Sequence, residues 1–169
     1  MEHAAEVLDA FKKYDTNILR TLSDKILADG FIERNKQVIR LAIISHSLSK
    51  IAEKEYYRKD QEKWGNFMIL IEKGFEELSK DDKKITAVEK AVVDLDKHFG
   101  RYKESIIHLS KIRKGSTLYA WGVSLTMASE LVDVPEYELM KHIGSTKIVD
   151  EEGLGVSVSQ RLKDAEDVL

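Results

Sequence analysis

Apolar residues recur every three or four positions along most of the chain, which is the spacing of one face of an α-helix. This pattern predicts four long amphipathic helices, over residues 4–27, 33–57, 60–78 and 86–114. In the second of these, the apolar stripe is wide enough to suggest burial on more than one side, so we expect it to be the central helix. Long helices with short connections predict an all-α fold, a helical bundle.

Local signals predict where some of these helices begin and end. Asp29-Gly30 should end the first helix, because glycine accepts the left-handed conformation at a helix C-terminus. Thr86 and Glu89 have the spacing of a capping box, in which both side chains bind free amides at a helix start. Gly115-Ser116 should close the fourth helix.

The next segment, residues 117–148, has the pattern of a helix, a tight turn and a second helix. Ala128 is a small residue where the two helices would cross. Asp133 would occupy the turn in a left-handed conformation, which aspartate tolerates better than most residues. Pro135 suits the first position of the second helix, and Gly144 suits its end.

Within this segment, residues 127–143 (MASELVDVPEYELMKHI) resemble the helix-turn-helix of excisionase-like and MerR-like regulators. The resemblance implies a second helix that reads DNA. This helix would expose the carboxylates of Glu136 and Glu138 and has no arginine to read guanine. We therefore expect nucleic-acid contact to come mainly from five basic residues: Lys111, Arg113, Lys114, Lys141 and Lys147.

The charge of the chain is unevenly distributed, although its net value is only −3 over 169 residues. Residues 97–115 contain six basic residues and one acidic residue, a net charge of +5, whereas residues 116–169 contain four basic and ten acidic residues, a net charge of −6. We therefore divide the chain into a bundle (1–115) and a helix-turn-helix-like module that ends in a short helix (116–169). The alternative is one continuous domain.

The composition restricts where the protein works. Without cysteine, the chain has no disulfide, thiolate metal site or cysteine nucleophile. Its first residues lack the basic start and apolar run of a signal peptide, and its most apolar run, Val38–Leu48, is too short and too polar to span a bilayer. We expect a cytoplasmic protein without membrane attachment. A surface rich in Lys and Glu without Cys favours a thermophilic, archaeal source.

The histidines are the main candidates for chemistry. Acid and histidine lie four residues apart at Asp94 and His98, at Glu104 and His108, and at Glu138 and His142. This spacing is typical of solvated pairs on one helix face. A metal site needs three or four converging ligands, and no motif of that kind occurs, so we expect no metal and no other cofactor.

His46 lies within the apolar second helix, next to Ser45 and Ser47. We interpret it as a core or interface histidine. The alternative is a general base in a small hydrolase, assisted by an acid such as Glu53. The sequence contains neither a phosphate-binding glycine loop nor a nucleophile elbow, so it gives catalysis little support.

Three hypotheses for the function remain. The first is a non-enzymatic regulatory protein that self-associates, as a homodimer, and contacts DNA or RNA weakly and in a salt-sensitive way through its C-terminal module. The second is a protein–protein adaptor in which the helix-turn-helix shape is structural. The third is the small hydrolase that uses His46.

Overall fold

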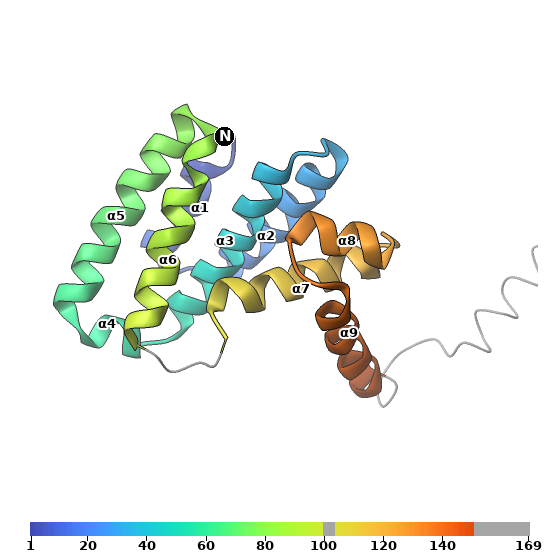
Figure 1. Ribbon diagram of the computed structural model, residues 1–169. Coiled ribbons are helices and arrows are strands. Elements are labelled where there is room, and N and C mark those ends of the chain that lie inside the picture. The colour runs from blue at the N-terminus through green and yellow to red at the C-terminus, as the bar shows by residue number, and fades with distance from the viewer. Residues whose placement is uncertain (100–103, 151–169) are drawn as a thin grey trace, which may run out of the picture.

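The structure is a computed structural model that describes residues 1–99 and 104–150, with side chains for 1–99 and 104–144. All regular structure in these ranges is helical, which confirms the all-α class (Figure 1). The elements are α1 (Ala4–Lys12), α2 (Thr16–Ile32), α3 (Lys36–Glu53), α4 (Tyr56–Lys59), α5 (Gln61–Lys80), the 3-10 turn η1 (Asp82–Lys84), α6 (Ile85–Phe99), α7 (Ile106–Ala120), α8 (Leu125–Val132) and α9 (Glu136–Asp150). In the described ranges, no helix is both long enough and apolar enough to cross a membrane.

Helix α3 is the centre of the fold, as its wide apolar stripe predicts. It contacts α1, α2, α6, α7 and α8, and eleven of its 18 residues are buried. Buried serines join α2 to α3, since Ser23 Oγ donates to the carbonyl of Ala42 at 2.6 Å and Ser45 Oγ donates to that of Leu19 at 2.8 Å. These bonds satisfy hydroxyls that would be costly to bury alone. Helices α5 and α6 lie side by side at one end, and α7, α8 and α9 form the other (Figure 1).

Two of the predicted long helices are divided near their middle, and the second of the four ends at Glu53, before the short helix α4. The first is interrupted at Tyr14, whose φ is 54°, and Asp15 then caps α2 by accepting a hydrogen bond from the amide of Ile18 at 2.9 Å. The fourth is divided between α6 and α7, and Ser105 caps the start of α7. The apolar spacing continues across both breaks, which is why it predicts single helices.

Gly30 does not end a helix, contrary to the prediction from Asp29-Gly30, because α2 continues to Ile32. A Cβ atom at position 30 would lie 2.9 Å from Ile39 Cγ1, closer than real Cβ contacts. Gly30 therefore allows α2 and α3 to approach each other closely. The turn between them comes later, where Arg34 has a φ of 53° and Asn35 caps α3.

The predicted capping box is also wrong, because Thr86 and Glu89 lie within α6, which begins at residue 85. Both side chains bind Arg40 of α3 instead. The Arg40 Nε donates to Glu89 Oε1 at 3.0 Å, and its Nη2 donates to Thr86 Oγ1 at 3.0 Å. The two residues therefore connect α6 to the central helix.

The C-terminal segment has a helix, a turn and a second helix in α8 and α9. Asp133 between them has a φ of 57°, which confirms the left-handed conformation predicted at this position. Helix α9 continues past Gly144, so the prediction that this glycine ends the helix is wrong. The predicted boundary at residue 115 falls inside α7, where Gly115 gives room to Leu139 of α9: a Cβ atom there would lie 2.9 Å from Leu139 Cδ1.

Candidate functional site

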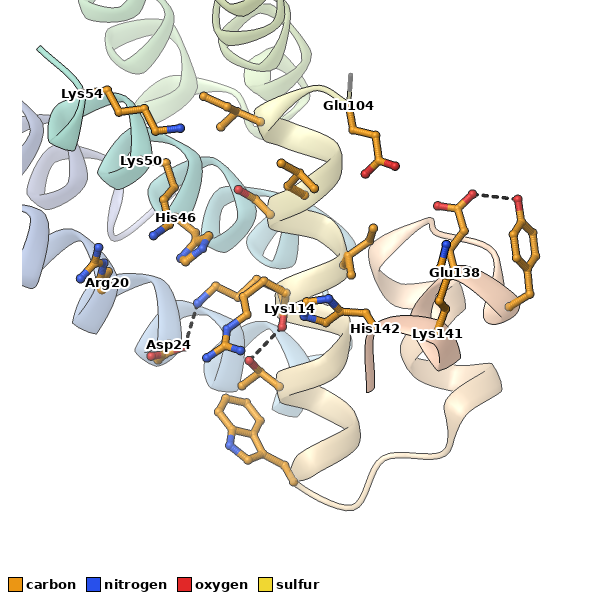
Figure 2. Close-up of a pocket in the computed structure, with 18 residues that line it drawn as sticks. Arg20, Asp24, His46, Lys50, Lys54, Glu104, Lys114, Glu138, Lys141 and His142 are labelled. Carbon is orange, nitrogen blue, oxygen red and sulfur yellow. Dashed lines mark hydrogen bonds and ion pairs between the residues drawn. The ribbon is translucent and has the colours of Figure 1, made fainter. Parts of the chain in front are cut away.

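A groove of about 1200 Å³ lies along α7, between α2 and α3 on one side and α9 on the other (Figure 2). Six basic side chains line it, from Arg20, Lys50, Lys54, Arg113, Lys114 and Lys141. The lining carboxylates are those of Asp24, Glu104 and Glu138. The lining therefore has a formal charge of +3 on a chain whose net charge is −3. We call this feature the cationic groove.

Lys114 forms the floor of the groove together with Asp24. Its side chain is buried, and its Nζ donates to Asp24 Oδ1 at 2.7 Å (Figure 2). Burial lowers the pKa of Lys114, and the hydrogen bond from Lys114 to Asp24 only partly opposes this effect. A buried ammonium needs such a partner, because leaving it alone would cost several kcal/mol. Lys114 therefore connects α7 to α2 and has its charge already balanced.

His46 lies beside Lys50 on the wall formed by α3 (Figure 2). Burial lowers the pKa of His46 to about 3, and the positive charges of Lys114, Lys50 and Arg113 add to this effect. The ring is therefore neutral near neutral pH. Its Nδ1 atom is buried and hydrogen-bonds to no group of the described chain, so the protein does not fix its tautomer.

The acid expected to assist His46 in a hydrolase is engaged elsewhere. Glu53 forms an ion pair with Arg20, and its other oxygen lies 3.4 Å from the Nζ of Lys50. Within the described residues, no carboxylate hydrogen-bonds to His46. A general base also needs a pKa near the working pH, and that of His46 lies far below neutrality. The geometry therefore does not favour the hydrolase hypothesis.

Arg113 and Lys141 are the cations that a ligand can reach most easily. Both side chains are exposed, and neither has an ion pair with another described residue. Two aromatic rings line the same groove and are open to solvent, since Trp121 is 47% exposed and Tyr137 is 71% exposed. The groove thus combines accessible positive charge with exposed ring faces.

The five basic residues predicted from the sequence have different surroundings. Arg113, Lys114 and Lys141 line the groove, but only Arg113 and Lys141 are exposed. Lys111 instead forms an ion pair with Asp133, with its Nζ 2.8 Å from Oδ2. Lys147 lies in α9, and its side chain is outside the described residues.

The sequence does not predict the other wall of the groove, which α2 and α3 supply. Arg20 and Lys50 lie on helices far along the chain from α7, and no motif in the sequence connects them with it. The only sequence feature that could have indicated this wall is the run of three consecutive polar residues around His46 in an otherwise apolar helix.

The sequence predicts that His98 and His108 each pair with an acid four residues earlier on the same helix. This prediction is wrong, because both histidines contact acids that belong to other helices. The Nε2 atom of His98 lies 3.4 Å from Asp60 Oδ2, at the start of α5. The Nε2 atom of His108 lies 2.8 Å from Glu138 Oε2 and connects α7 to α9. In the part of the chain that the structure describes, no three His, Asp or Glu side chains form a group that could hold a metal ion.

Comparison with known proteins assigns the chain to no family. No protein-family model matches its sequence, and neither a curated protein nor a solved structure matches it. The function must therefore be inferred from the chemistry of the cationic groove.

Proposed function

We propose that this protein is a non-enzymatic binding protein that associates with nucleic acid through the cationic groove. The observation that carries the proposal is the charge of the groove, +3 on a chain of −3. Cations held near one another repel, and an anionic partner removes this cost. Phosphates bound by Lys and Arg side chains supply most of the non-specific affinity of proteins for nucleic acid.

Backbone contact with stacking fits the groove better than base reading by α9. The first turn of α9 carries Glu136 and Glu138, which oppose a phosphate, and Glu138 is already bonded to His108. The exposed rings of Trp121 and Tyr137 can stack on unpaired bases beside the cations. The proposed partner is therefore a single strand of DNA or RNA, bound with little sequence preference.

A titration of labelled single-stranded oligonucleotides, followed by fluorescence anisotropy, tests this proposal. If Arg113, Lys141 and Lys50 each contact a phosphate, the slope of log affinity against log salt is about −2. Raising the salt from about 50 to about 200 mM should then weaken binding about 20-fold.

Two double variants test whether the oligonucleotides bind in the cationic groove. R113Q/K141Q removes two exposed cations of the groove, so we expect weaker binding at low salt and a shallower salt slope. K73Q/K90Q removes two exposed cations of α5 and α6, outside the groove, and should leave both quantities unchanged. Equal losses in the two variants, or no binding of the native chain at tens of micromolar, would refute the proposal.

A second function, a protein–protein adaptor that self-associates, is supported by exposed apolar side chains on α8 and α9. Met127, Tyr137 and Met140 are all largely open to solvent. The same titration separates the two functions. An absence of nucleic-acid binding at low salt, together with a dimer at the same protein concentration, favours the adaptor.

A further inference from the structure

The part of the cationic groove around His46 contains polar groups that the protein itself leaves incompletely paired. His46 Nδ1 has no hydrogen-bond partner in the described chain. Lys50 shares Glu53 with Arg20. Arg113 is exposed and forms no ion pair with another described residue. Groups left in this state, at the edge of a groove, are typical of a binding site.

The charge around His46 favours an anionic ligand. The charged groups that act on the ring are Lys50 from α3, Asp24 from α2, and Arg113 and Lys114 from α7. Three cations and one carboxylate give a formal charge of +2. A phosphate of a nucleic-acid strand carries about −1 and would offset half of this surplus, whereas a phosphate monoester carries about −2 near neutral pH and would offset all of it.

We infer that His46, Lys50 and Arg113 form a binding site for a phosphate group. The guanidinium of Arg113 offers a two-pronged hydrogen bond to phosphate oxygens, and the ammonium of Lys50 adds a charged donor. His46 lines the same groove, and because the protein does not fix its tautomer, the ring nitrogen that faces the phosphate can carry the proton and donate. The ion pair of Lys114 and Asp24 forms the floor of the groove below these donors.

This site rests on the proposed function, because it would hold one phosphate of a bound strand. The same chemistry also suits inorganic phosphate or the phosphate of a mononucleotide. Free phosphate therefore tests the site apart from the strand.

The imidazole signal of His46 in an NMR spectrum of the full chain is the direct readout, assigned by its loss in the variant H46N. Inorganic phosphate should shift this signal in a saturable way and raise the pKa of His46 from about 3, because a bound anion offsets the charges of Lys50, Arg113 and Lys114. Chloride at the same ionic strength should do neither.

The variant R113Q should weaken phosphate binding at least about tenfold, because it removes a charged donor from an exposed position. K73Q, which removes an exposed lysine of α5 far from the groove, is the matched control and should bind phosphate like the native chain. Equal phosphate affinity in R113Q and the native chain would overturn the assignment.

Three further ligands distinguish the sources of the phosphate: a 5′-mononucleotide, a single strand, and a strand whose backbone carries uncharged methylphosphonates. If the charged strand binds but phosphate leaves His46 unchanged, the inference is overturned while the proposed function stands. If phosphate or the mononucleotide binds but the strand does not, the site is upheld for small phosphate compounds and the proposed function fails. Competition between phosphate and the charged strand, with no binding of the uncharged strand, supports both.

Discussion

Removing the partner of the buried lysine is the sharpest test of how the floor of the groove is built. The variant D24N keeps the shape of the side chain but removes the charge that balances Lys114, which is only 2% exposed. Breaking a fully buried ion pair in this way costs about 3–5 kcal/mol. The Asp24 side chain is 56% exposed, so water screens the pair, and we expect a loss of about 2 kcal/mol in the free energy of unfolding.

The pH dependence of this loss follows from the pKa of Lys114. Burial lowers this pKa in the folded protein below 10.5, its usual value, and removing Asp24 lowers it further. A lysine with a lowered pKa binds fewer protons when folded, so stability rises with pH between its folded and unfolded pKa values. The loss in D24N should therefore be full near neutral pH and should shrink as the pH approaches 10.5.

Urea unfolding of four proteins measures this effect: the native chain, D24N, K114M and the double variant. Methionine keeps most of the length of Lys114 without its charge, so D24N/K114M should be clearly more stable than D24N alone. In thermal unfolding, a loss of about 2 kcal/mol corresponds to about 4–8 °C in Tm for a chain of this size. If D24N loses less than about 0.5 kcal/mol, or if the two substitutions are additive, the buried pair does not hold the floor as described.

Two further substitutions test the packing around the central helix. Gly30→Ala should destabilise the protein by about 1–3 kcal/mol in urea unfolding, because its Cβ would meet Ile39 at 2.9 Å. Gly65→Ala is the matched control, since a Cβ there meets no atom within 4 Å. It should stabilise the protein by about 0.5–1 kcal/mol. Equal effects of the two substitutions on the free energy of unfolding would contradict the close approach of α2 and α3. Tyr57→Phe should lower the free energy of unfolding by about 2 kcal/mol, because the buried Asp96 loses the 2.8 Å hydrogen bond from the Tyr57 hydroxyl. An unchanged midpoint of urea unfolding would show that this bond adds no stability.

The fold class and the central helix could be predicted from the sequence because burial leaves a periodic pattern within each helix. The wide apolar stripe of residues 38–51 corresponds to the enclosed α3. The break at Tyr14 could not be predicted in this way, because tyrosine rarely adopts a positive φ and the apolar spacing continues beyond it. The role of Gly30 could not be predicted from the spacing either, because it depends on the close approach of the neighbouring helix α3.

The candidate site depends on contacts between helices, so the sequence predicted only part of it. The basic run before the C-terminal module includes Arg113, which lines the groove. Its partners Arg20 and Lys50 come from α2 and α3, and only the packing of α7 on these helices brings them together. The histidines show the same effect, because spacing within a helix pairs His108 with the wrong acid.

The two walls of the cationic groove differ in how freely they can change. The wall from α2 and α3 belongs to the core, whereas α9 makes its main contacts with α7 and α8 and is seated through Leu139 over Gly115. Tyr137 and Lys141 lie on α9, are exposed, and face the groove. Substitutions at these two positions would reshape the groove without touching the core. A new ligand preference can therefore arise on this fold through α9 alone, at little cost in stability.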